Sequence, residues 1–152
     1  ISSQVLAQTM MGVQDVVHDS AKSASGRVQA EIEQVYRSKD QIYIRYSVSN
    51  QSSFPFRMTT PDVSNPSITQ EPISLMSLRN HQLSAQTCAA YKTKPGASLS
   101  VIQAEAVTND IAPGQKTTGL VSVRSSQGNP PQLYLLNFGA DQGQPIVAVA
   151  VL

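Results

Sequence analysis

The feature that most constrains the fold of this chain is the strict alternation of apolar and polar residues that begins after Gly26. In RVQAEIEQVYR, residues 27–37, every second position of one face is apolar, at Val28, Ala30 and Ile32. QIYIRYSVSN, residues 41–50, repeats the pattern with Ile42, Ile44, Tyr46 and Val48. Successive side chains of a strand point to opposite faces, so a period of two predicts half-buried strands. The short SKD stretch between them predicts a tight turn and hence an antiparallel hairpin.

The remainder of the chain reads as short apolar stretches separated by turns rich in Gly, Pro and Asn. Further strands are expected in NQSSFPFRM, ISLMSLRN, ASLSVIQAEAV, TTGLVSVRS, QLYLLNFGA and PIVAVAVL, the first of them broken by Pro55. A short helix capped by Ser84 is expected in LSAQTCAAYKTK. No strand–helix–strand alternation occurs. About seven or eight short strands predict an all-β fold, an immunoglobulin-like antiparallel β-sandwich over residues 27–152, with a jelly roll or a small barrel as the alternative.

The first 26 residues show a different period. Apolar residues at helical spacing predict an amphipathic helix over about residues 4–19, with a stripe made of Val5, Leu6, Met10, Val13, Val16 and Val17. SAKSASG, residues 20–26, is small and polar and predicts a flexible linker. We therefore divide the chain into a helix with its linker, residues 1–26, and a sandwich domain. The stripe is expected to be buried on its own domain, on a second copy or in the groove of a partner.

The carboxy-terminal segment PIVAVAVL, residues 145–152, is apolar at every position. Such a strand must be covered on both faces or paired with something outside the molecule. An interior position is favoured, and an edge position would invite a partner strand. The residues expected to contact a partner therefore come from the helix stripe and this strand, and are Val5, Leu6, Met10, Val13, Val17, Ile146, Ala148 and Ala150.

The composition argues against several classes of protein. Charged residues make up 14% of the 152 residues, against about 25% in average domains, and this balance favours an extracytoplasmic all-β protein. The net charge of +1 comes without a basic run, which argues against nucleic-acid binding. No apolar run approaches the roughly 20 residues of a membrane-spanning helix. Because the sequence begins with Ile1, we expect a processed chain or one cut from a longer protein.

GQKTTG, residues 114–119, has some of the residues of a phosphate-binding loop. That loop requires G-x-x-x-x-G-K-[ST] between a strand and a helix. Here Gln115 follows Gly114, Asn109 stands where the first glycine belongs, and a β pattern follows. The segment instead predicts a type II turn in which Pro113 fixes φ and Gly114 supplies a positive φ. Gly119 is expected to allow a bulge or close packing of strands.

The same region carries a resemblance to a known class of domain. The pattern I-x-P-G-x-x-x-G-x-V resembles the turn and strand near the end of many bacterial extracytoplasmic immunoglobulin-like domains. It is formed here by Ile111, Pro113, Gly114, Gly119 and Val121. The resemblance covers roughly the last third of the chain and implies a fold, but no functional residues.

No constellation of catalytic or metal-binding residues stands out. His18 lies beside Asp15 and Asp19 on the predicted helix, and an exposed helical face accounts for all three, so no metal site is expected. Cys88, flanked by alanines, is expected to be a small core residue rather than a nucleophile assisted by His81.

Two further polar features have ordinary explanations. Glu31 and Glu33 share one face of a strand, and this predicts a solvated surface, because paired glycosidase carboxylates come from different elements. The NQS sequence at Asn50 fits a glycosylation acceptor only in a eukaryotic secretory protein.

These observations predict a non-enzymatic protein-interaction or adhesion module of the bacterial envelope or cell exterior, as part of a surface or secretion assembly. The expected partner is a protein or a second copy of the chain, and no cofactor or metal is expected. Two alternatives stay open. One is a sandwich that binds carbohydrate or another small ligand, through the aromatic residues of YIRY (43–46) and FPF (54–56). The other is a hydrolase that uses Cys88 or a carboxylate pair.

Overall fold

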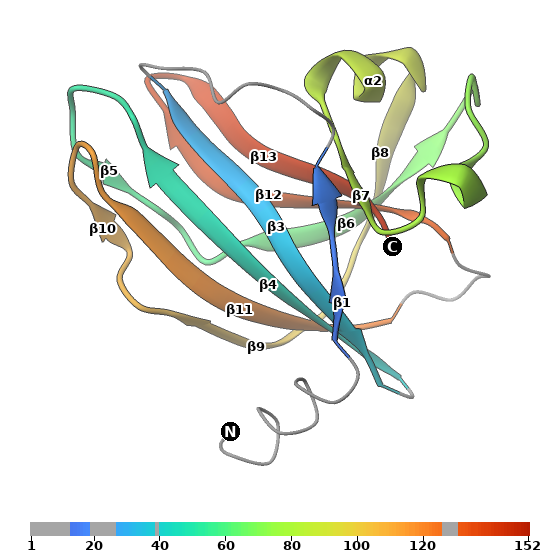
Figure 1. Ribbon diagram of the computed structural model, residues 1–152, viewed down its shortest axis with the longest axis horizontal. Helices are drawn as coiled ribbons and strands as arrows, with labels where there is room; N and C mark the ends of the chain where they lie inside the picture. Colours follow the sequence, from blue (N-terminus) through green and yellow to red (C-terminus); the bar gives the residue numbers. More distant parts are fainter. Residues whose placement is uncertain (1–12, 19–26, 39, 126–130) are drawn as a thin grey trace.

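The computed structural model describes residues 13–18, 27–38, 40–125 and 131–152, and these form an all-β, sandwich-like fold (Figure 1). The first sheet has five strands in the order β1 (Gln14–Asp15), β3 (Val28–Arg37), β4 (Gln41–Asn50), β11 (Lys116–Arg124) and β9 (Val101–Ala106). The second has six strands in the order β2 (Val17–His18), β7 (His81–Leu83), β13 (Gln144–Val151), β12 (Leu133–Asp141), β6 (Asp62–Ile68) and β8 (Thr93–Ser98). A separate two-stranded ribbon pairs β5 (Phe56–Arg57) with β10 (Asp110–Ile111).

The number of strands is larger than the sequence suggested. The described residues form thirteen strands, where about seven or eight were expected. The difference comes mainly from β1, β2, β5, β7 and β10, which have two or three residues each. Strands this short leave no recognisable period in a sequence.

The predicted hairpin is confirmed as β3 paired antiparallel with β4. The register shifts between Ile32 and Gln34, so Glu33 is the extra residue of a β-bulge. Because of this shift, the next residue of β3 to face the core after Ile32 is Val35, and both side chains are fully buried. The bulge therefore keeps apolar residues on the core side while the strand bends.

The main core lies between the two sheets. It contains the inward residues of β3, β4 and β11 together with Leu136, Phe138, Ile146, Ala148 and Ala150 of the opposite sheet. The rings of Tyr46 on β4 and Phe138 on β12 lie 4.8 Å apart, tilted by 55°, and join the two layers. Val121 and Val123 point inward as predicted.

An insertion between β6 and β8 covers the outer face of the second sheet (Figure 1). It contains the 3-10 helix η1 (Leu75–Leu78), β7 and the helix α2 (Ala85–Ala90). Ser84 caps α2 by accepting a 3.2 Å hydrogen bond from the backbone N–H of Thr87, which confirms the predicted helix. Together with the buried Leu83 and Tyr91, the insertion forms a second apolar cluster against Val149 and Val151.

The carboxy-terminal strand β13 is an interior strand, paired with β12 on one side and β7 on the other. Ile146, Ala148 and Ala150 face the main core, whereas Val149 and Val151 face the insertion. The chain itself therefore covers the core face of the run, and the outer face at Val149 and Val151, whereas Val147 is 40% exposed. Its backbone edges are already occupied by neighbouring strands, so β13 offers no edge for a partner strand along its paired residues.

The prediction of a helix over residues 4–19 is wrong for residues 14–18, which form β1 and β2 with Val16 between them. Residues 1–12 and 19 lie outside the described residues. β1 pairs antiparallel with β3, and β2 pairs parallel with β7 in the other sheet. β-branched residues such as Val16 and Val17 fit strands better than helices. Val16 is buried in the main core, and its N–H donates to the Glu33 carbonyl oxygen at 3.0 Å. The predicted linker, residues 20–26, also lies outside the described residues.

The turn before β11 is built as the sequence predicts. Gly114 has a φ of +78°, and the N–H of Gln115 donates to the Ala112 carbonyl oxygen at 2.9 Å. Strand β11 follows, not a helix, so the backbone geometry of a phosphate-binding loop is absent at these residues. The turn therefore serves as the corner at which β11 begins.

Candidate functional site

Strand β9 is a free edge of the five-stranded sheet. It pairs with β11 on one side, and no strand among the described residues pairs with its other side. Val101 and Ile102 are 38% and 45% exposed, and Val107 just beyond the strand is 81% exposed. An exposed apolar edge with unpaired N–H and C=O groups is a template for pairing with another chain.

The other outer strands of the described fold are short or protected. β1 and β2 have two residues each. β8, at the far edge of the second sheet, has the sequence TKPGAS, with Lys94 and Pro95 exposed. Proline lacks the N–H that a ladder needs, and an edge lysine opposes strand addition. By contrast, β9 contains no proline and has Glu105 as its single charged residue.

A groove of about 490 Å³ opens beside the second half of β9. Its lining consists of Tyr46, Met58, Thr60, Pro61, Ala104, Glu105, Ala106 and Asn109. The small side chains of Ala104 and Ala106 leave this side of β9 open. The groove therefore adds side-chain binding space to the free backbone of the strand.

Tyr46 places a polar group in this largely polar groove. Its side chain is 1% exposed, and burial raises the pKa of the phenol to about 12. The hydroxyl is not one of the fully buried polar atoms that lack a partner among the described residues, so a polar group that enters the groove can reach it. Tyr46 is kept in place by its ring contact with Phe138.

A second cluster of functional side chains lies where the amino-terminal segment meets β3. The side chains of His18, Glu31 and Glu33 each offer one ligand atom, and these atoms lie within 4.8 Å of one another. His18 comes from β2, whereas both glutamates come from β3 at its bulge. A groove of about 510 Å³ opens beside His18 and Glu33 and is also lined by Arg45 and Lys116.

Of the eight residues predicted to contact a partner, the structure describes five. Val5, Leu6 and Met10 lie outside the described residues. Val13 is half-buried and Val17 is exposed in β2. The remaining three, Ile146, Ala148 and Ala150, are buried in the core. No periodicity in the sequence marks β9 as the free edge, because strand order is set by pairings distant in the chain.

The aromatic residues proposed for ligand binding and the cysteine proposed for hydrolysis lie in separate parts of the fold. Tyr43 packs against Tyr36 with ring centroids 5.8 Å apart, Phe54 is exposed, and Phe56 is buried. Cys88 is half-buried in the cluster under the insertion, and burial raises the pKa of its thiol. A raised pKa favours the unreactive thiol over the nucleophilic thiolate.

The NQS sequence has a structural role. Asn50 is fully buried, and its side-chain amide donates to the carbonyl oxygens of Phe54 at 2.7 Å and Ile111 at 2.9 Å. Its Oδ1 accepts from the N–H and hydroxyl of Ser52 at 2.9 and 2.6 Å. The side chain therefore joins the end of β4 to the β5–β10 ribbon, where a glycan could not be attached without breaking these bonds.

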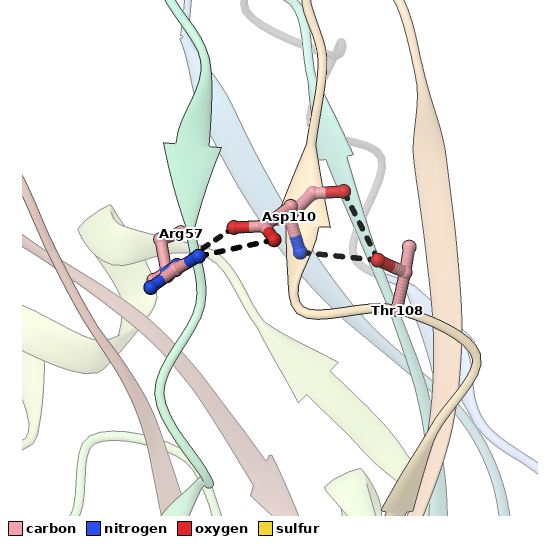
Figure 2. A network of polar contacts seen from close by, with 3 residues as sticks. All are labelled: Arg57, Thr108 and Asp110. Carbon is pink, nitrogen blue, oxygen red and sulfur yellow. Dashed lines mark hydrogen bonds and ion pairs between the residues drawn. The ribbon is translucent and has the colours of Figure 1, made fainter.

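The ribbon itself is closed by an exposed ion pair (Figure 2). Nε of Arg57 donates to Oδ1 of Asp110 at 2.7 Å, and Nη2 donates to Oδ2 at 3.2 Å. The Arg57 side chain holds the pKa of the Asp110 carboxyl below its ordinary value of 3.8. Thr108 also holds the backbone of Asp110. Its hydroxyl donates to the Asp110 carbonyl oxygen at 3.3 Å and accepts from the Asp110 N–H at 3.2 Å.

Comparison of the chain with protein-family models, with curated proteins and with solved structures finds no significant match. The fold and its surfaces are therefore the basis for assigning a function. Among the described residues, no helix has the length and apolar character needed to cross a membrane.

Proposed function

We propose that this chain is a non-enzymatic protein-interaction module, an immunoglobulin-like sandwich of the bacterial envelope or cell exterior. We further propose that it binds an extended segment of a partner protein by strand addition along β9. The single observation that carries the proposal is the free apolar edge of β9 beside the groove floored by Tyr46.

The strand order supports the immunoglobulin-like assignment. Immunoglobulin-like sandwiches have one sheet in the order A-B-E-D and another built on G-F-C. The order β3-β4-β11-β9 corresponds to the first sheet, and β13-β12-β6-β8 corresponds to the second with one added strand. Taken in chain order, the strands then correspond to A (β3), B (β4), C (β6), the added strand (β8), D (β9), E (β11), F (β12) and G (β13). β1, β2 and β7 are then additions at the outer edges.

The chemistry of the edge defines the kind of segment it would take. Apolar side chains of the partner would cover Val101 and Ile102 while its backbone pairs with β9. Glu105 then favours a basic side chain at the other end of the segment. The Tyr46 hydroxyl offers a hydrogen bond to a polar group that enters the groove. We therefore propose a short extended segment that is apolar at one end and carries Lys or Arg at the other.

The composition supports the proposed location outside the cytoplasm, and the raised pKa of Cys88 supports a non-enzymatic function. The low content of charged residues favours an extracytoplasmic protein. The raised pKa of the Cys88 thiol argues against a cysteine nucleophile. Reading the gene upstream of the codon for Ile1 tests the location of the protein. A signal or lipoprotein sequence there would support an extracytoplasmic location, and a cytosolic fusion would oppose it.

Selection of binding peptides tests the strand-addition proposal. A library of random heptapeptides displayed on phage is selected on the chain, and the affinities of enriched peptides are measured by fluorescence polarisation. We expect peptides with apolar and basic ends, and binding at least about tenfold weaker to Ile102→Lys, because an edge lysine opposes strand pairing.

Val147→Lys is the matched control. Val147 is 40% exposed, close to the 45% of Ile102, but lies on the interior strand β13. The control should keep the affinity of the unmodified chain. An absence of enriched peptides, or equal binding by Ile102→Lys, would contradict the proposal. A dimer that is lost in Ile102→Lys would instead assign β9 to a second copy of the chain.

A further inference from the structure

The geometry points to a divalent transition-metal site formed by His18, Glu31 and Glu33. We propose that these three side chains bind one ion of the Zn²⁺ class at the junction between β2 and β3. Their ligand atoms lie within 4.8 Å of one another, so modest rotamer changes bring them to a common ion. We expected no metal site from the sequence because an exposed helical face accounted for His18 with Asp15 and Asp19, but His18 lies in the strand β2 instead.

One nitrogen of the His18 imidazole is held by a hydrogen bond. Its Nε2 lies 2.8 Å from the carbonyl oxygen of Ile32. A carbonyl oxygen only accepts hydrogen bonds, so Nε2 carries a proton, and in the neutral imidazole Nδ1 keeps its lone pair. Metal-binding histidines characteristically donate their second N–H to such a carbonyl or a carboxylate, which fixes the ring. No hydrogen bond among the described residues occupies Nδ1.

The two carboxylates lack a neutralising partner. Arg57 and Asp110 form the one ion pair found in the described part of the chain. Arg45 and Lys116 line the neighbouring groove, but neither forms an ion pair with Glu31 or Glu33. Two like charges held close together repel each other, and a bound cation converts that repulsion into attraction.

One carboxylate is also held in place from outside the cluster. The hydroxyl of Ser47 on β4 donates to Oε1 of Glu33 at 2.7 Å. Ser47 is buried, with 3% of its surface exposed, so this contact restricts the rotamers of Glu33. Oε2 of Glu33 takes no part in this bond. An ordered carboxylate loses less conformational entropy when it binds an ion.

The donor set indicates the class of metal. One imidazole nitrogen and two carboxylates suit Zn²⁺ or Mn²⁺, whereas Ca²⁺ prefers oxygen ligands alone. Three protein ligands leave one position of a tetrahedral Zn²⁺ ion for water or another ligand. Because β2 belongs to one sheet and β3 to the other, a bound ion would link the two sheets.

Titration calorimetry with zinc chloride tests the inference on the whole chain. We expect one ion per chain, and affinity at least about tenfold weaker in His18→Ala and in Glu33→Gln. A saturating ion also stabilises the folded state by mass action, so the melting temperature should rise by about 5 °C or more at 100 times Kd. Both variants should lose this rise.

His81→Ala is the control for surface histidines. His81 is half-buried, and its Nδ1 is engaged with the carbonyl oxygen of Arg79 at 3.0 Å. This variant should bind zinc as tightly as the unmodified chain. Two results would overturn the inference: no binding at millimolar zinc, or equal affinity in His18→Ala. The circular dichroism spectrum of each variant separates loss of the site from loss of the fold.

Discussion

A Cβ atom added at Gly119 would lie 2.3 Å from the hydroxyl oxygen of Tyr46 and 2.6 Å from the carbonyl oxygen of Glu105. β11 lies between β4 and β9 in the sheet, and Gly119 is paired with Tyr46 on one side and Ala106 on the other. The missing side chain leaves room for the phenol of Tyr46 to cross β11 and line the groove beside β9. Gly119 thus couples the core aromatic residue to the proposed binding edge.

Gly119→Ala should destabilise the fold by about 1–3 kcal/mol, because an added methyl group in a filled space forces its neighbours to move. Urea denaturation followed by circular dichroism measures the effect. In the background of Tyr46→Phe the same substitution should cost less, since the hydroxyl is gone, but the contact with the Glu105 backbone remains. Unchanged stability in Gly119→Ala would contradict this close packing of Gly119 against Tyr46 and Glu105.

Asn50→Ala should lower the free energy of unfolding by about 1–3 kcal/mol, because it leaves the buried Ile111 carbonyl oxygen without this donor. Thermal and urea unfolding measure the change. The exposed Asn109 is the control, and Asn109→Ala should stay within about 0.5 kcal/mol of the unmodified chain. If the two variants were equally stable, Asn50 would not hold the β4 corner together.

Cys88 should react slowly with iodoacetamide in the folded protein at pH 8. Burial raises the pKa of its thiol, so little thiolate is present, and the side chain is half-buried. Unfolding in urea exposes the thiol and should increase the rate by at least about tenfold. Rapid labelling of the folded chain would favour the hydrolase alternative over an interaction module.

Arg57→Gln should raise the pKa of Asp110 towards its ordinary value of 3.8, because it removes the hydrogen bonds and the positive charge of Arg57 that favour the carboxylate. The folded-state pKa is lowered, so the stabilisation is present above the unfolded-state pKa and is lost as pH falls through the folded-state pKa. Both side chains are exposed, and salt should weaken the effect. NMR titration of the carboxyl carbon measures it, with Arg124→Gln as a control that should leave the Asp110 pKa unchanged.

The sequence was informative where local pattern and local structure agree. Alternation predicted the β3–β4 hairpin, Pro113 with Gly114 predicted the turn before β11, and Ser84 predicted the cap of α2. Each of these depends on residues near one another in the chain. The apolar character of residues 145–152 also predicted an interior strand, although its outer face is covered only at Val149 and Val151.

Features that depend on contacts between distant parts of the chain could not be predicted from the sequence. Val16 and Val17 fit a helical stripe, but a backbone hydrogen bond to β3 and pairing with β7 decided their conformation. The juxtaposition of His18 with Glu31 and Glu33 follows from that pairing. Nothing local shows that β11 lies between β4 and β9, so the free edge and its groove were not predicted.

The measurement that tests strand addition most directly is amide hydrogen exchange of β9 with and without a selected peptide. Binding should slow exchange at least about tenfold at alternate residues of 101–106, whose N–H groups would pair with the peptide backbone. The amides of β8, at the protected edge of the other sheet, should exchange at unchanged rates. Unchanged exchange in β9 with a saturating peptide, or protection confined to another strand, would contradict the proposed function.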